Sequence, residues 1–296
     1  MNFYSDTATR ISRAYNSLSD LHKRMADFIL KSPVDAAMMT IDELSHACGV
    51  SNATANRFAK ALGFDGFSDF RTQQAEEVKQ ALLPVEKLRT QRDGSASCFD
   101  IITGGIEQDI ANLQQTLETL TDESCERAVN MVLGAERIFT YGSGISYHIA
   151  GILTHELEPF CRGNVSMLAA TGNGINAAYR RLVHVTPRDL LVFISFPRYA
   201  ADTLELYGLA RQRETRILCI TDRPSSPLAG EADVVLYAQA ERRLLPNSAT
   251  AAFALVDGLV AAVANRSQDA VDVQMRLSVP RPSLEPEPDG CPERQP

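Results

Sequence analysis

The sequence predicts an all-α N-terminal domain followed by an α/β domain, in which a five-stranded parallel sheet has helices on both faces. Two observations support this. Apolar residues recur at helical spacing over most of residues 11–134, whereas from residue 137 onward short apolar runs alternate with helical stretches. A segment rich in Pro, Gly, Ser and mixed charge separates the two patterns, and 296 residues suffice for about two domains.

A short helix, a tight turn and a second helix are predicted after an amphipathic helix over residues 11–29. Thr40 and Glu43 have the spacing of a capping box, which opens the first helix of the pair. Gly49 can adopt the positive φ of the turn, and Ser51 can cap the second helix, which runs from residue 52 to Leu62. Helices joined in this way form a helix-turn-helix, which can place its second helix in the major groove of DNA.

The domain boundaries follow from these patterns. Residues 64–82 continue as a helix, so we expect a helix-turn-helix domain over residues 1–82 and a linker over residues 83–99. An α/β ligand-binding domain is expected over residues 100–279. Residues 280–296 contain six prolines and few apolar residues, which predicts a disordered tail.

The second domain is expected to begin with two helices and then to alternate strands with helices. Its helices are predicted over residues 100–120, 123–134, 146–160, 173–183, 201–213 and 249–265. Its strands are predicted at Arg137–Tyr141, Val165–Leu168, Leu190–Ser195, Arg216–Thr221 and Val234–Tyr237. Such alternation builds a parallel sheet with helices on both faces.

Charge and composition exclude several classes of protein. The net charge of −8 is uneven: residues 1–100 carry 12 Lys and Arg against 13 Asp and Glu, and the remainder carries 17 against 24. All five lysines precede residue 88, so the second domain has neither a Schiff-base lysine nor a P-loop lysine. No membrane-spanning stretch, secretory signal or closely spaced cysteine pair occurs, which favours a cytoplasmic protein with reduced thiols.

The helix over residues 52–62 is predicted to have an apolar face and a polar face. The apolar face comprises Ala55, Phe58, Ala59 and Leu62, and the polar face Asn52, Ala53, Asn56, Arg57 and Lys60. Asn can read adenine, Arg can read guanine or bind phosphate, and the capped helix N-terminus suits a phosphate oxygen. The alternative is an ordinary helical hairpin with a solvated face, but such faces usually mix charges of both signs, and no acid occurs between Ser51 and Gly63.

The run from Met39 to Arg71 resembles the N-terminal DNA-binding domain of RpiR/MurR-type regulators, and the resemblance extends over roughly residues 10–80. Those domains end in a helix with Ser, Ala-Thr and Arg-Phe, followed by Leu-Gly-Phe and Gly-Phe. The resemblance places the DNA-reading helix at Ser51–Leu62. The DNA-binding residues expected from pattern and resemblance together are Ser51, Asn52, Thr54, Asn56, Arg57 and Lys60.

A ligand site is predicted where the strands of the second domain end. The first strand runs into Gly142-Ser143-Gly144 and then Ser146 at the start of a helix, a turn that can bind an anion through backbone amides and hydroxyls. The strand that ends at Ser195 is expected to lie beside it, because ligands bind at the carboxyl edge of a parallel sheet. Two ordinary turns remain the alternative.

Residues 100–266 resemble the sugar isomerase (SIS) domain, which implies the SIS fold and a phosphosugar ligand. The match rests on the glycine loop, on Ile217–Asp222 and on the residues that follow this stretch. The family's second loop reads Ser-x-Ser-Gly-x-Thr, but here Pro197, Arg198 and Ala200 replace Ser, Gly and Thr. Arg198 could compensate by gripping a phosphate or a carboxylate, or it could be a salt-bridged surface arginine.

The ligand-binding residues expected are therefore Gly142, Ser143, Gly144, Ser146, Ser195 and Arg198. No catalytic residue, metal site or cofactor is predicted. His148 and His155 lack the spacing of a metal-binding helix. Glu156, His155 and Glu231 are conceivable bases for an isomerase, but nothing singles one out.

The sequence thus predicts a DNA-binding transcriptional regulator whose SIS domain senses a small phosphorylated, sugar-like metabolite. Its expected partners are a double-stranded DNA operator, that anionic metabolite and further copies of itself, in a homodimer or a homotetramer. The alternative is a phosphosugar isomerase with an accessory helical domain. The sequence leaves open the effector, the operator, and repression against activation.

Overall fold

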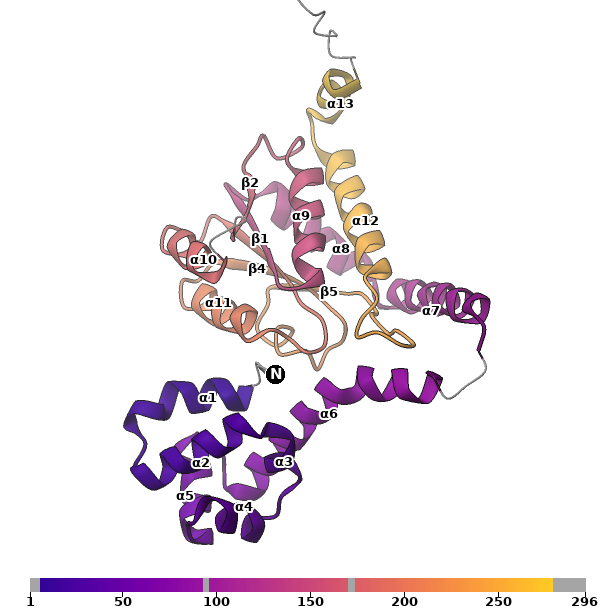
Figure 1. Ribbon diagram of the computed structural model, residues 1–296. Helices are drawn as coiled ribbons and strands as arrows, with labels where there is room; N and C mark the ends of the chain where they lie inside the picture. The colour runs from indigo at the N-terminus through magenta and orange to yellow at the C-terminus, as the bar shows by residue number, and fades with distance from the viewer. Residues whose placement is uncertain (1–5, 93–95, 170–173, 279–296) are drawn as a thin grey trace, which may run out of the picture.

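The chain forms a helical N-terminal domain and an α/β domain, which are joined through the long helix α6 (Phe67–Arg92) (Figure 1). The structure, a computed structural model, describes residues 6–92, 96–169 and 174–278. The tail predicted over residues 280–296 lies outside these ranges. No helix within them is both long and apolar enough to cross a membrane.

Helices build the N-terminal domain. In chain order they are α1 (Asp6–Ala14), a 3₁₀ turn (Tyr15–Ser17), α2 (Asp20–Lys31), α3 (Pro33–Met38), α4 (Ile41–Cys48), α5 (Asn52–Ala61) and the first part of α6. Their inward side chains form one core in which Met25, Leu44, Phe58 and Phe70 are almost fully buried. Phe58 and Phe70 meet edge to face with ring centroids 6.0 Å apart, which fixes α5 against α6.

The prediction of one helix over residues 11–29 is wrong, because the chain breaks between α1 and α2. Leu18 is extended (φ −73°, ψ 145°), and the Ser19 hydroxyl accepts the backbone N–H of His22 as the N-cap of α2. Serine favours such caps over helix interiors, which explains a break that apolar spacing does not reveal. Helix α3 was also missed.

Helix α6 is longer than predicted and continues through residues 83–92, the first part of the expected linker. Most of residues 85–92 are strong helix formers, such as Glu86, Lys87, Leu88 and Arg89, which accounts for the extension. The boundary between the two domains stays a prediction.

The α/β domain contains the predicted five-stranded parallel sheet, in the order β2-β1-β3-β4-β5. The strands are β1 (Ile138–Gly142), β2 (Val165–Met167), β3 (Leu190–Ile194), β4 (Arg216–Thr221) and β5 (Val234–Tyr237). All five lie within one or two residues of the predicted bounds. Both β1 and β3 are buried along their whole length, as expected of strands covered on both faces.

Helices cover both faces of the sheet (Figure 1). They are α7 (Cys98–Thr119), α8 (Asp122–Leu133), α9 (Ile145–Leu157), α10 (Gly174–Leu182), α11 (Ala201–Arg211), α12 (Thr250–Arg266) and α13 (Ala270–Ser278), of which α13 was not predicted. Helices α8, α9 and α12 pack on one face, against side chains such as Ile138 and Val192. Helices α10 and α11 pack on the other, against side chains such as Phe139 and Phe193.

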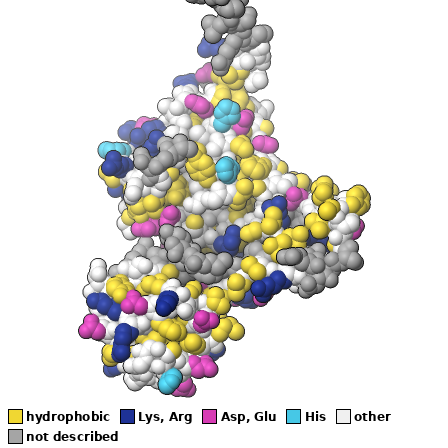
Figure 2. Space-filling model, in the orientation of Figure 1, with side chains coloured by type: hydrophobic (Ala, Val, Ile, Leu, Met, Phe, Trp, Pro, Cys, Tyr) yellow, Lys and Arg dark blue, Asp and Glu magenta, His cyan; other side chains and the backbone are white. Residues whose placement is uncertain are grey.

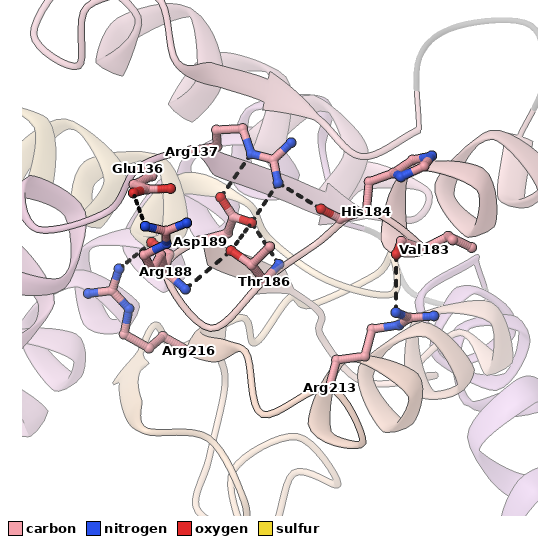
Figure 3. A network of polar contacts seen from close by, with 9 residues as sticks. All are labelled: Glu136, Arg137, Val183, His184, Thr186, Arg188, Asp189, Arg213 and Arg216. Carbon is pink, nitrogen blue, oxygen red and sulfur yellow. Dashed lines mark hydrogen bonds and ion pairs between the residues drawn. The ribbon is translucent and has the colours of Figure 1, made fainter.

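A polar network ties together the amino-terminal ends of the strands (Figure 3). The guanidinium of Arg137 forms two hydrogen bonds with the fully buried carboxylate of Asp189, at 2.9 and 2.7 Å. The same carboxylate accepts the backbone N–H and the hydroxyl of Thr186, at 2.8 and 2.9 Å. Asp189 therefore joins the segments that enter β1 and β3, at the edge of the sheet opposite to the carboxyl ends of the strands.

Candidate functional site

The α4–α5 unit has the helix-turn-helix geometry that the sequence predicts. Thr40 and Glu43 form a complete capping box at the start of α4. Gly49 ends that helix with φ 63°, a conformation that a side chain would strain. Ser51 caps α5 by accepting the backbone N–H of Thr54, at 3.2 Å. These local contacts set the direction of α5.

The exposed face of α5 carries most of the predicted DNA-binding residues. The side chains of Ser51, Asn52, Arg57 and Lys60 are exposed, whereas Phe58 and Ala59 are buried on the opposite face. Long cationic side chains on a capped, well-anchored helix can reach phosphates and base edges in a DNA groove.

Two of the predicted DNA-binding residues, Thr54 and Asn56, use their side chains for hydrogen bonds within the protein. Thr54 is buried, and its hydroxyl lies 2.9 Å from that of Ser51. Asn56 is half-buried, and its Oδ1 accepts the backbone N–H of Phe67 at 2.9 Å, which ties α5 to the start of α6. The Asn56 amide N–H₂ is the group on this side chain that is left to contact DNA.

The tertiary structure also brings charges from other helices to this unit. The Nδ2 of Asn52 donates to Asp42 on α4, so a carboxylate lies beside a face that has no acid in its own sequence. Arg24, on α2, donates to the Gly49 carbonyl at 3.3 Å and places a cation at the turn. The spacing within α5 could not reveal either residue, because both come from other helices.

The predicted glycine loop forms a tight turn between β1 and α9. A Cβ on Gly142 would lie 2.5 Å from the Ser146 carbonyl oxygen, so only glycine fits there without displacing backbone. Gly144 has φ 61° and is exposed, as the N-cap of α9. Ser143 is half-buried, whereas Ser146 is buried and donates its backbone N–H to the Ser143 carbonyl at 3.2 Å.

The second predicted loop follows β3 and contains Ser195 and Arg198. Ser195 is buried, and its backbone N–H donates to the Ile220 carbonyl at 3.1 Å, which continues the sheet pairing. Arg198 is exposed and has φ 68°, a left-handed conformation that few residues other than glycine adopt. Among the residues that the structure describes, no side chain or carbonyl pairs with its guanidinium.

A pocket opens at the carboxyl ends of β3, β4 and β5, where a parallel sheet binds its ligands. It is lined by Lys87, Pro197, Arg198, Asp222, Arg223, Gln239, Ala240, Glu241, Leu245, Pro246 and Asn247. Of the six predicted ligand-binding residues, Arg198 alone lines this pocket. The sequence did not point to Lys87, Arg223, Gln239 or Asn247, because the fold brings them together from three separate segments, namely α6, the loop after β4 and the loop between β5 and α12.

Asp222 is the buried acid of this pocket, and its charge is compensated. Its carboxylate accepts the Tyr199 hydroxyl at 2.7 Å and forms an ion pair with Arg223. Burial, together with the hydrogen bond to Asp222, raises the pKa of Tyr199 well above its usual value, so this phenol stays protonated. Arg223 also lies 3.9 Å from the carboxylate of Glu241.

The side chains considered as isomerase bases lie outside the pocket. Glu156 and His155 lie next to each other on α9, where their side chains are half exposed and mostly exposed. Glu231 is mostly exposed and lies 3.9 Å from Arg211. Across the described ranges no three His, Cys, Asp or Glu side chains are grouped so that they could hold a metal ion.

Comparisons with known proteins agree with this division of the chain. Residues 5–81 match the family model described as helix-turn-helix domain, rpiR family, and residues 131–262 match that of the SIS domain. A helix-turn-helix-type transcriptional regulator of Thermotoga maritima is 29% identical over 234 residues, which cover 78% of this chain and 80% of the relative. HexR of Pseudomonas aeruginosa, also a helix-turn-helix-type transcriptional regulator, is 26% identical over 77% of this chain and 76% of its own length.

Solved structures show the same fold. The sugar isomerase domain of an RpiR transcription factor from Sphaerobacter thermophilus aligns with a TM-score of 0.55 and 29% identity, over 60% of this chain and 97% of that domain. NanR of Vibrio vulnificus, solved with ManNAc-6P, aligns with a TM-score of 0.55 and 23% identity, over 92% of this chain and 96% of its own.

Fold, domain order and relatives define the class: this chain is a two-domain transcriptional regulator that joins a helix-turn-helix domain to a SIS domain. Within that class, its N-terminal domain is of the rpiR helix-turn-helix type.

Proposed function

We propose that this regulator binds double-stranded operator DNA through α5 as a homodimer in the cytoplasm, and that a small phosphorylated, sugar-like metabolite controls this binding from the SIS domain. The observation that carries the proposal is the exposed Arg57 and Lys60 on a helix whose other face is locked into the core. DNA binding through such cations is sensitive to salt, because each neutralised phosphate releases counterions.

The ligand part of the proposal rests on the cationic pocket. Arg198 replaces the glycine of the usual phosphate loop and keeps the backbone conformation suited to glycine. Its guanidinium, which has no partner in the described part of the chain, can grip an oxyanion. The NanR structure was solved with a phosphorylated sugar, which supports the same ligand class here. Ser143 and Ser146 of the glycine loop do not line this pocket, and their contacts with the ligand stay a prediction.

The proposed homodimer rests on the surface of α7, which is suited to contact a second copy of the chain. Large apolar side chains form one exposed stripe along this helix, namely Phe99, Ile102, Ile106, Ile110 and Leu117. Figure 2 shows hydrophobic side chains gathered over this part of the molecule. The stripe exposes on the order of 500 Å² of apolar side chain, a large part of the ~800 Å² that each partner of a stable complex buries.

A gel shift tests the proposed function. The probe is the DNA upstream of the protein's own gene, with and without a panel of phosphorylated sugars and sugar acids. Salt-sensitive binding that one of these compounds changes is the expected result. A protein that binds no such DNA at any salt concentration would contradict the proposal.

The enzyme alternative receives its own test. We infer that the chain is not an isomerase, because Glu156, His155 and Glu231 do not line the pocket. A coupled isomerase assay should therefore show no turnover. Turnover that disappears in Glu156→Gln would establish the alternative.

A further inference from the structure

The pocket at the carboxyl edge of the sheet has a wall that does not belong to the SIS fold. Lys87 lies on α6, the helix that begins in the DNA-binding domain, yet its side chain lines the pocket together with Arg198. The Lys87 ammonium donates to the Arg242 carbonyl at 2.9 Å, which holds α6 against the loop between β5 and α12.

This loop is fixed on its other sides as well. Asn112, on α7, donates to the Glu241 carbonyl at 2.8 Å, and Asn247 donates to the Pro197 carbonyl at 3.0 Å. These hydrogen bonds hold the loop against α7 and against the loop after β3, and Lys87 contacts the same loop.

The cations that line the pocket differ in whether they pair with a carboxylate. Arg223 pairs with both carboxylates of the lining, Asp222 and Glu241. Lys87 has a neutral carbonyl as its partner, and Arg198 has no partner among the described residues. Two cations that form no ion pair with the described residues thus line one pocket, and oxyanions such as phosphate are the groups that satisfy such a pair.

We propose that Lys87 is a ligand-contacting residue, and that the phosphate group of the effector is held between Lys87 of α6 and Arg198 of the SIS domain. The inference rests on the proposed function, since it assigns a second contact at the same ligand site. It also gives the site a direct link to DNA binding. The bound anion joins the SIS domain to α6, and α6 carries Phe67 and Phe70 in the core that anchors α5.

Helix α6 is the element that connects Lys87 to the DNA-binding domain. Its first turn is fixed to α5 by the bond from the Phe67 N–H to Asn56. A ligand that binds better when α6 lies against the pocket stabilises one placement of the DNA-binding domain over others. Ligand and DNA affinities are then coupled with the same factor in both directions.

The test measures binding of inorganic phosphate to the full-length protein by thermal shift and calorimetry, against chloride at equal ionic strength. Lys87→Gln removes the charge but keeps a donor for the Arg242 carbonyl, so it separates anion binding from the structural bond. Lys87→Arg keeps the charge. Lys79→Gln is the matched control, because Lys79 lies on the same helix, is mostly exposed and pairs with Glu76.

We expect phosphate affinity to fall about tenfold in Lys87→Gln and to persist in Lys87→Arg and Lys79→Gln. Wild-type affinity in Lys87→Gln, or no phosphate binding by the wild type, would overturn the proposal. Operator binding by the unliganded proteins is measured separately. Its absence in the wild type would defeat the proposed function, while the phosphate titrations would still decide the role of Lys87.

Discussion

Arg198 combines a strained backbone with a side chain that has no partner among the described residues. Its left-handed conformation (φ 68°) costs on the order of 1 kcal/mol relative to glycine, because the Cβ crowds the following carbonyl. Strain of this kind tends to persist at functional sites. Here the side chain that causes the strain lines the pocket of the proposed ligand site.

The change Arg198→Gly should therefore raise stability and weaken ligand binding together. Glycine relieves the strain in the folded state, which stabilises the protein, but it also increases the conformational entropy of the unfolded chain, which destabilises it. We expect the first effect to be larger and Tm to rise by about 1–3 °C. Affinity for inorganic phosphate should fall about tenfold. Thermal unfolding and calorimetric titration measure the two effects.

Arg162 provides the control, because it also has a positive φ (55°) but lies outside the pocket and pairs with Asp269. Arg162→Gly should leave phosphate affinity unchanged. If Arg198→Gly binds phosphate as tightly as the wild type, Arg198 has no role in the ligand site.

Asp189 makes stability depend on pH. Burial by itself would raise the pKa of this carboxyl, but hydrogen bonds from Arg137 and Thr186 outweigh it and hold the pKa below its usual value. A depressed pKa in the folded state contributes stability above the unfolded value of about 3.9, and this stability is lost as pH falls through the folded pKa.

The change Asp189→Asn should destabilise the protein by about 2–4 kcal/mol at neutral pH, because Arg137 loses its buried partner. Urea unfolding at neutral pH and near pH 3 should show a smaller pH dependence in this variant than in the wild type. Glu136→Gln, which breaks the exposed ion pair with Arg188 in the same network, should cost under about 1 kcal/mol. Equal losses in the two variants would contradict the assigned role.

At the scale of elements, α5 separates groups that hold the helix from groups that face outward. Asn56 satisfies the Phe67 N–H at the start of α6, whereas Arg57 is exposed and donates, at a long 3.4 Å, to the Thr54 hydroxyl. Adjacent residues on one helix thus serve different purposes.

We expect Arg57→Ala to weaken operator binding by about 1–3 kcal/mol with little loss of stability. Asn56→Ala should instead lower the free energy of unfolding by about 1–2 kcal/mol, because the Phe67 N–H loses its acceptor. Gel shifts and urea unfolding of both variants distinguish the two roles. Unchanged operator affinity in Arg57→Ala would remove Arg57 from the DNA contact.

Across the molecule as a whole, the α7 stripe and the two-domain layout together bear on how a dimer would present two recognition helices to DNA. Helix-turn-helix proteins usually read two half-sites about 34 Å apart with two copies of the recognition helix. The apolar stripe gives a surface through which two chains can be held together, and α6 connects that assembly to α5.

Ile106→Asp should therefore convert the proposed dimer into monomers, because it places a charge in the centre of the stripe. Sedimentation velocity measures the mass, and operator affinity should fall in parallel. Val183→Asp is the control, since Val183 is similarly exposed but lies after α10, on the other face of the sheet. A dimeric Ile106→Asp protein, or a monomeric wild type, would show that the stripe does not mediate assembly.

Elements whose cause is local can be predicted from the residues alone. Thr40, Gly49 and Ser51 define the α4–α5 unit through bonds within a few residues, and alternating apolar runs define the parallel sheet. The break at Leu18 was not predicted, because apolar spacing does not reveal that Ser19 caps a new helix. The extension of α6 was not predicted, because Pro84 and the mixed composition after it were interpreted as a linker, although the residues that follow favour a helix.

The packing of the folded chain, by contrast, determines which side chains share a site. It gave Asn56 a partner on α6, placed Asp42 beside Asn52 and brought Lys87 to the pocket of Arg198. These contacts depend on how distant segments pack, and residue spacing carries no record of that packing.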